Sequence, residues 1–198
     1  AASIRVKRQA DKAICAGSKE FEGELAGLQL WNNALVDTEV MRNQAAREGG
    51  GLWNQSGTTM NVSLSTIDGN SAFGTASDDG GAGIFNNGGI LNIETSTISN
   101  NSSFGIGGTG GGILNANNGD LNILTSTISN NTSAGGGGGI ANLGANTVVN
   151  ASTIVMNNAD LSGGGILSIS NTEIKNTIIA LNADFTACVL VNQKPIVN

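Results

Sequence analysis

The chain is built on one repeated unit, and this repeat constrains the fold more strongly than any other feature of the sequence. A complete copy is GGGILNANNGDLNILTSTISNN at residues 110–131. It contains a glycine run that leads into apolar-x-Asn, then an apolar-x-apolar triplet, then Ser-Thr-Ile-x-x-Asn. The closing asparagine recurs at spacings of 27, 31, 30, 26 and 25 residues, at Asn43, Asn70, Asn101, Asn131, Asn157 and Asn182.

Each unit holds three short segments in which apolar and polar residues alternate, as is typical of β-strands. Glycine and asparagine separate the segments and favour the positive φ angles that tight corners need. Equivalent strands of successive units can then pair in parallel, about 4.8 Å apart. The sequence therefore predicts an all-β fold, a parallel β-helix with three sheets and about six coils of 22–32 residues. The preference of parallel crossovers predicts that it is right-handed.

The alternation also assigns side chains to the inside of the β-helix. Three aliphatic ladders are predicted to point inward, and each fully buried side chain contributes about 1.5–3 kcal/mol. The recurrent asparagines should point inward at the corners, where stacked amides can bond to one another and to backbone groups. The ladders are Leu52, Ile84, Ile113, Ile140 and Ile166; Met60/Val62, Leu91/Ile93 and Leu121/Ile123; and Ile67, Ile98, Ile128, Ile154 and Ile179.

The glycine runs and the asparagines that follow them resemble the paired GGA(I/L/V) and FxxN repeats of polymorphic outer membrane proteins. The GGGIxN…STIxxN pattern is also similar to secreted bacterial β-helix proteins with the pectin-lyase-like fold. Gly80-Gly81-Ala82-Gly83-Ile84 approaches the GGA form, whereas the other copies contain GGG. The resemblance covers residues 27–182 and implies a surface-displayed or secreted passenger, often an adhesin.

Charge is unevenly distributed along the chain. The net charge is −6, and from Glu48 through Glu173 there are eight carboxylates and no Lys or Arg. Such a surface is a poor match for nucleic acid or anionic lipid. No run of about 18 apolar residues is present, so no transmembrane segment is predicted. The predicted partner is a protein or glycan surface, or a second copy of the chain.

The two ends of the chain depart from the repeat. Residues 1–26 are predicted to form an N-terminal cap, made of a strand at 4–6, a short helix over 10–25, or both, because an open solenoid end is an unpaired strand edge. Residues 27–182 form the predicted β-helix, and 183–198 a partial last coil or a tail. Cys15 and Cys188 would lie nearly 30 Å apart across six coils, so two free thiols are predicted.

Catalysis is not expected from the repeat region. Polysaccharide lyases need a basic residue and often calcium, and hydrolases need grouped carboxylates. The chain has no histidine, and Asp68, Glu94, Asp120 and Asp160 fall at different phases of the repeat. The adjacent Asp78 and Asp79 belong to a loop, where solvated carboxylates are common. We therefore expect no catalytic residues, no metal and no cofactor; a polysaccharide-binding or polysaccharide-acting protein is the alternative.

A threonine column favours a second alternative, an ice-binding surface. One threonine per coil is predicted to face outward on the third sheet. Leu64 and Asn150 interrupt the neighbouring rank, where Thr95 and Thr125 stand. Threonine is also simply a good residue for the solvent face of a strand. The column contains Thr66, Thr97, Thr127 and Thr153.

Two phenylalanines, Phe73 and Phe104, each stand third after an asparagine corner, in the longest connections between coils. In solenoids, variable loops of this kind often form the binding face. The two rings either form a stacking ridge for sugars or a protein partner, or fold over the corner and shield the coils beneath.

The outward positions of the first sheet form an apolar column that contains both tryptophans. Six stacked apolar residues exceed what isolated exposed hydrophobic side chains explain. Either another element covers the column or it is a docking surface, led by Trp31, Trp53 and Phe85. The remaining members are Leu114, Ala141 and Leu167. Together, these patterns favour a non-catalytic extracellular or cell-surface β-helix with an adhesive or structural role.

Overall fold

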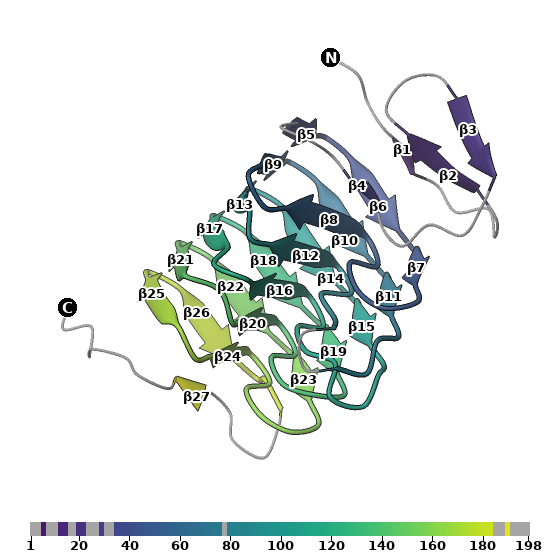
Figure 1. Cartoon of the computed structure of the whole chain (residues 1–198). Coiled ribbons are helices and arrows are strands. Elements are labelled where there is room, and N and C mark those ends of the chain that lie inside the picture. Colours follow the sequence, from purple (N-terminus) through teal and green to yellow (C-terminus); the bar gives the residue numbers. More distant parts are fainter. Residues whose placement is uncertain are drawn as a thin grey trace.

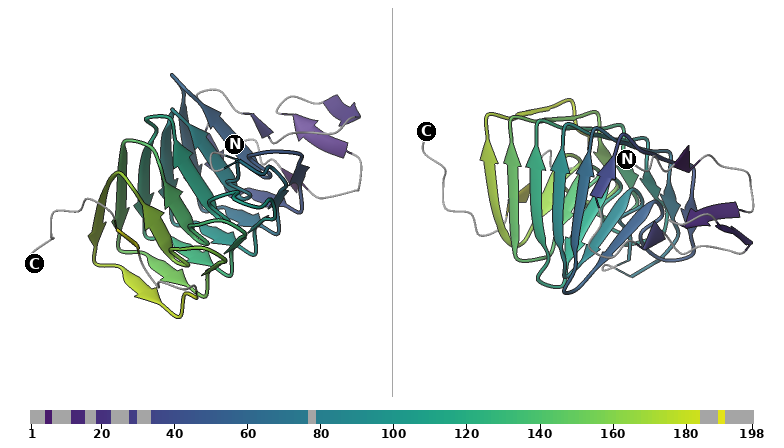
Figure 2. Two further views of the ribbon diagram at one scale, coloured as in Figure 1. Left: turned by 60° about the horizontal axis from the view of Figure 1, so that its bottom comes forward. Right: turned by 90° about the horizontal axis from the view of Figure 1, so that it is seen from above.

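The computed structural model describes residues 5–6, 12–15, 19–22, 28–29, 34–76, 79–183 and 189–190, with side chains for 37–76 and 79–183. In these ranges the chain winds into a solenoid of parallel strands, without helices (Figure 1). Two further views show the coils following one another along one axis, with the strands of each sheet side by side (Figure 2). The prediction of an all-β parallel β-helix is confirmed.

Each coil passes through the sheets in the same order. Sheet 1 contains β4 (Leu28–Gln29), β8 (Leu52–Gln55), β12 (Ile84–Asn87), β16 (Ile113–Ala116), β20 (Ile140–Asn142), β24 (Ile166–Ser168) and β27 (Val189–Leu190). Sheet 2 contains β5 (Ala34–Val36), β9 (Thr59–Ser63), β13 (Ile90–Glu94), β17 (Asp120–Leu124), β21 (Asn146–Asn150) and β25 (Asn171–Lys175). Sheet 3 contains β1 (Arg5–Val6), β6 (Glu39–Met41), β10 (Thr66–Asp68), β14 (Thr97–Ser99), β18 (Thr127–Ser129), β22 (Thr153–Val155) and β26 (Ile178–Ala180).

A fourth parallel sheet was not predicted. Sheet 4 contains β7 (Gln44–Ala45), β11 (Ser71–Ala72), β15 (Ser102–Ser103), β19 (Thr132–Ser133) and β23 (Asn158–Ala159). Its strands are two residues long, which is too short for alternation to show in the sequence. Within the described residues, five coils contribute a strand to all four sheets, and a sixth, β24 to β26, contributes to three. The predicted number of coils, about six, differs from this only in the incomplete last coil.

The three aliphatic ladders are confirmed as the core. Strand register places like residues on one another, as where Ile84 pairs with Ile113 and Ile67 with Ile98. The ladders are buried from coil to coil, and Ile179 of the last coil packs against them half-buried. The second ladder changes at Leu121, which pairs with Thr147 in the next coil.

Buried asparagine ladders lie beside the aliphatic ones. The Oδ1 of Asn131 accepts hydrogen bonds from the backbone N (3.0 Å) and Nδ2 (2.9 Å) of Asn101. Its Nδ2 donates to the Oδ1 of Asn157 (2.9 Å) and to the carbonyl of Ile98 (3.0 Å). The predicted burial of the corner asparagines is confirmed, since Asn101 and Asn131 are both 0% exposed. A second buried ladder connects Asn54, Asn86, Asn115 and Asn142.

Each described coil enters and leaves sheet 3 through a residue with positive φ, and only one of these residues is glycine. L residues in this conformation are strained by about 1–2 kcal/mol. A serine compensates on the entry side: Ser126 Oγ donates to the carbonyl of Leu124, and Ser126 N donates to Ser152 Oγ. The entry residues are Asp37, Leu64, Thr95, Thr125, Ala151 and Asn176, and the exit residues are Arg42, Gly69, Asn100, Asn130, Met156 and Leu181.

The N-terminal residues add three strands. β1 pairs in parallel with β6, whereas β2 (Lys12–Cys15) and β3 (Lys19–Glu22) pair antiparallel. A helix over 10–25 is therefore wrong for the residues of β2 and β3. That residues 1–26 act as a cap, and that 183–198 form a partial last coil or a tail, stays a prediction, and Cys188 lies outside the described residues. In the described part of the chain, no helix has the length and apolar character to cross a membrane.

Candidate functional site

The outward column of sheet 1 is closed to solvent along much of its length. Phe85 is 2% exposed, and Leu114 and Ala141 are fully buried. Trp53 is half-buried and stacks on Phe85, with ring centroids 6.2 Å apart. These side chains form an apolar cluster separate from the core. Phe85 is therefore covered, as one of the two predicted alternatives has it. Binding or self-association through this column stays a prediction, and Trp31 lies outside the described residues.

The glycine run that precedes each strand of sheet 1 lies against this column. Gly137 has φ 69°, and a Cβ there would lie 2.8 Å from the Cβ of Ala141. A Cβ at Gly49 would lie 3.2 Å from the Cβ of Trp53 and 3.5 Å from that of Phe85. The glycines thus serve as more than corner residues, because their missing side chains let the backbone approach the apolar column. Trp53 Nε1 is buried there without a hydrogen-bond partner.

A second aromatic pair remains in solvent. Phe73 and Phe104 directly follow β11 and β15, and their backbone N atoms donate to the carbonyls of Ala45 and Ala72 in the preceding coils. This register stacks the two rings, with centroids 5.4 Å apart and planes 20° apart. Phe73 is 45% exposed and Phe104 57% exposed, and Ile106 in the same loop is 87% exposed. This geometry favours an exposed ridge over rings that shield the corner.

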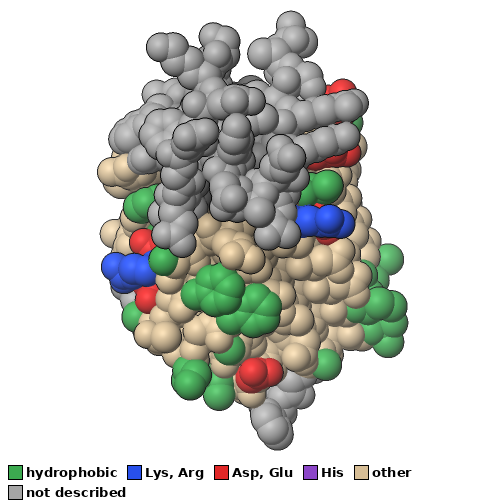
Figure 3. All heavy atoms as spheres, turned by 90° about the vertical axis from the view of Figure 1, so that its right-hand side faces the viewer, with side chains coloured by type: hydrophobic (Ala, Val, Ile, Leu, Met, Phe, Trp, Pro, Cys, Tyr) green, Lys and Arg blue, Asp and Glu red, His purple; other side chains and the backbone are tan. Residues whose placement is uncertain are grey.

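The face that carries sheet 4 shows this surface from outside (Figure 3). A compact hydrophobic patch lies in the middle of a surface made mostly of polar side chains and backbone. Sequence reasoning found Phe73 and Phe104 from their equal distance to the asparagine corner. It missed Ile106, whose single apolar side chain in a glycine-rich loop carries no periodic signal.

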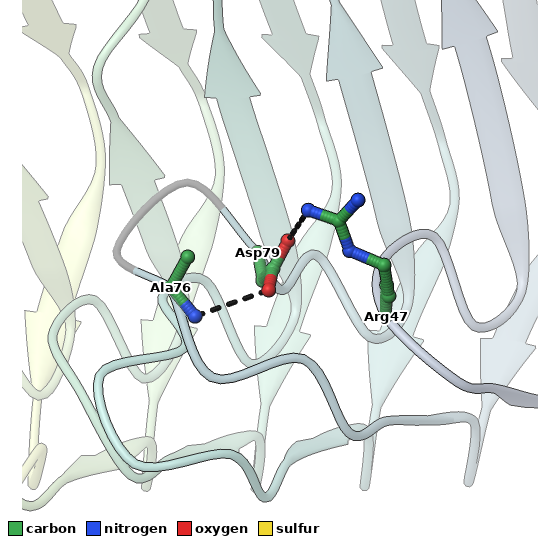
Figure 4. Close-up of polar contacts among 3 residues, drawn as sticks. All are labelled: Arg47, Ala76 and Asp79. Carbon is green, nitrogen blue, oxygen red and sulfur yellow. Dashed lines mark hydrogen bonds and ion pairs between the residues drawn. The ribbon is translucent and has the colours of Figure 1, made fainter.

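The loop that follows Phe73 is held by Asp79 (Figure 4). Its carboxylate accepts hydrogen bonds from the backbone N of Ala76 (3.0 Å) and from Arg47 Nη2 (2.8 Å), which also forms an ion pair with it. Burial raises the pKa of Asp79. The hydrogen bonds from Ala76 and Arg47 and the charge of Arg47, with a smaller contribution from Glu48, lower it by more, so the pKa of Asp79 lies below its ordinary value. Asp79 therefore joins this loop to the preceding coil, and Asp78 lies outside the described residues.

One protein family matches the chain. The Chlamydia polymorphic membrane protein repeat matches residues 125–143, from the corner after β17 through β18 and β19 to the end of β20. This segment is similar to the polymorphic membrane protein repeat. The resemblance found in the glycine runs and the closing asparagines is thereby confirmed. Searches of curated proteins and of solved structures found no match.

The polymorphic membrane protein repeat specifies scaffold rather than a site. Its matched segment contains the buried Ser126, Ile128, Asn131, Ile140 and Asn142. The exposed aromatic pair lies outside this segment, in loops whose length differs between coils. A binding role for the aromatic pair therefore depends on residues outside the matched segment.

The threonine column exists in register but is flanked by other residue types. Thr66, Thr97, Thr127 and Thr153 pair in sequence along sheet 3 and are each half-buried. The column continues into Glu39 at one end and Ile178 at the other. In the neighbouring rank, Thr125 is followed by Ala151 rather than by Asn150, because Asn150 pairs with Leu124.

Carboxylates stay dispersed over the solenoid. Asp68 accepts hydrogen bonds from Ser99 and Asn100 on sheet 3, and Asp120 accepts one from Asn146 on sheet 2. Among the described residues, no group of three or more His, Cys, Asp or Glu side chains is placed to hold a metal ion. Asp68 and Asp120 instead accept hydrogen bonds from side chains of the next coil.

Proposed function

We propose that this chain is a non-catalytic β-helix passenger, displayed on a cell surface or secreted, with an adhesive role. The polymorphic membrane protein repeat supports a surface location. The long, regular solenoid supports a scaffold role, since its repeated residues are engaged in ladders.

The observation that carries this proposal is the exposed Phe73–Phe104 pair. Burying two aromatic rings contributes strongly to binding, and aromatic residues are enriched where a few side chains dominate an interface. The Asp79–Arg47 ion pair and the coil-to-coil backbone bonds hold the pair in place. A pre-ordered surface loses little conformational entropy when it binds a partner.

A bead adhesion assay tests the proposal. Beads coated with the full chain are challenged with surfaces of immobilised neutral glycans, acidic glycans and extracellular proteins. The double variant Phe73→Ala/Phe104→Ala should reduce adhesion at least about fivefold, because an interface loses most affinity when its aromatic anchors are truncated. The matched control is Ile90→Ala, which removes an exposed side chain from sheet 2. Equal adhesion by the double variant, or turnover of any polysaccharide, would contradict the proposal.

Ice binding is a second candidate, favoured by the registered threonine column on sheet 3. The equal spacing of one hydroxyl per coil is suited to ordering water on a flat face. Thermal hysteresis and ice shaping by the parent chain, lost in Thr97→Lys/Thr127→Lys, would support it. A parent chain without hysteresis removes this candidate.

A further inference from the structure

The position occupied by Phe73 and Phe104 continues through the neighbouring coils. Ala134 N donates to the carbonyl of Ser103, and Asp160 N donates to that of Ser133, which repeats the bonding of the two phenylalanines. The column therefore runs in register through Ala46, Phe73, Phe104, Ala134 and Asp160. Two rings are followed by a methyl group and then by a carboxylate.

In this column the short side chain of Ala134 lies between the larger side chains of Phe104 and Asp160, and we call this gap in the column the recess. Phe73 stacks on one face of Phe104, so the other face is directed toward the coil of Ala134. Ala134 is too small to cover that face, and Phe104 remains 57% exposed. Asp160, two coils away from Phe104, is exposed at the far side of the recess. Two coils span about 10 Å, so the recess is one planar group wide.

The walls of the recess match one kind of ligand. A planar cation can stack about 3.5–4 Å from the ring and donate a hydrogen bond to a carboxylate at about 2.7–2.9 Å. These two distances, together with the length of the aspartate side chain, span the separation between Phe104 and Asp160. A polar column runs alongside, two residues earlier in the same strands, where Thr132 Oγ1 donates to Ser102 Oγ (2.8 Å). A guanidinium has five N–H donors for such surroundings, and its flat face stacks on aromatic rings.

The charge of the surface points to the same ligand. Between Glu48 and Glu173 the chain has no Lys or Arg, so no cation of this segment competes for Asp160. On the face shown in Figure 3, an acidic side chain lies below the hydrophobic patch, and basic side chains lie to its left and right, beside other acidic side chains. A surface of this sign attracts basic partners over about 8–10 Å at moderate salt.

We propose that the recess bounded by Phe104, Ala134 and Asp160 binds an arginine side chain of a basic partner polypeptide. The guanidinium stacks on the open face of Phe104, and its N–H groups donate to the carboxylate of Asp160. This inference rests on the proposed adhesive function and narrows its partner class from any protein or glycan to a cationic polypeptide.

Fluorescence anisotropy tests the proposal, with the full chain and a short labelled peptide in which arginine alternates with glycine. The same peptide with citrulline keeps the planar group without its charge, and the lysine peptide keeps the charge without the plane. We expect the arginine peptide to bind best. Asp160→Asn should weaken binding about fivefold to tenfold, as expected for loss of one charge-assisted contact. Asp120→Asn, an equal charge change on sheet 2, should alter it less than about twofold.

Ala134→Phe provides a second variant, because it extends the ring column into the recess and should abolish binding of the arginine peptide. Circular dichroism verifies that each variant folds, and Asp160→Asn decides the question if Ala134→Phe does not fold. Equal binding of the citrulline peptide, or equal effects of Asp160→Asn and Asp120→Asn, would overturn the proposal.

The adhesion assay separates this inference from the proposed function. Adhesion to a neutral glycan that depends on Phe104, without binding of the arginine peptide, overturns the arginine site and leaves the adhesive function standing. If Phe104→Ala keeps both adhesion and binding of the arginine peptide, the arginine site and the adhesive role of the aromatic pair are both overturned.

Discussion

Replacing one buried corner amide should destabilise the whole solenoid. The side chain of Asn131 takes part in four hydrogen bonds inside the coil stack, at 2.9–3.0 Å. Asn131→Ala leaves the backbone N and Nδ2 of Asn101 without this acceptor and the carbonyl of Ile98 without this donor, while Asn157 Oδ1 keeps its bond from the backbone N of residue 131. Each of these three orphaned buried groups costs about 1–3 kcal/mol, so the free energy of unfolding should fall by about 3–9 kcal/mol.

Urea unfolding of the full chain, followed by far-UV circular dichroism, measures this loss. The matched control is Asn122→Ala, in the same coil. The Nδ2 of Asn122 also donates to an asparagine of the preceding coil, Asn92 Oδ1 (3.0 Å), but on the solvent side of sheet 2. Because water replaces that bond, the control should change stability by less than about 0.5 kcal/mol. Equal losses in the two variants, or a loss below about 1 kcal/mol for Asn131→Ala, would refute the argument that burial makes the ladder essential.

Three further predictions concern backbone geometry and charge. Leu64→Gly should raise the free energy of unfolding in urea by about 0.5–1 kcal/mol, because Leu64 is exposed and strained at φ 51°. A fall in the free energy of unfolding would contradict the strain. Gly112→Ala should lower it by about 1–3 kcal/mol, because the added Cβ would lie 2.6 Å from the carbonyl O of Gly139, whereas Gly57→Asn, in open space at φ 78°, should be nearly neutral. The folded pKa of Asp79 lies below its ordinary 3.8, so the ionised carboxylate stabilises the fold above that ordinary value, and this stabilisation is lost as pH falls through the folded pKa. Asp79→Asn should therefore lower the free energy of unfolding at pH 7 and flatten the acid side of its pH dependence. An unchanged pH dependence would contradict this.

The interior of this protein could be derived from the sequence because a solenoid repeats its solution in every coil. The isoleucine ladder of Ile67, Ile98 and Ile128 shows which residues must face inward, and parallel stacking admits no other arrangement of the alternation. The equal placement of Asn101 and Asn131 likewise predicts amide ladders at the corners. Local pattern and long-range packing coincide here, since each strand pairs with a near copy of itself.

The surface depended on contacts that no repeat records. The sequence placed Phe85 on the outside of sheet 1, and it does point away from the core, but the approach of the glycine backbone and the neighbouring apolar side chains remove it from water. The stacking of Phe73 on Phe104, and the recess between Phe104 and Asp160, arise where coil stacking brings together residues of different type at the same position after the asparagine corner. Alternation determines which face of a strand a side chain occupies, because that is a property of the local backbone. Whether that face meets solvent is decided only by what the rest of the chain places over it.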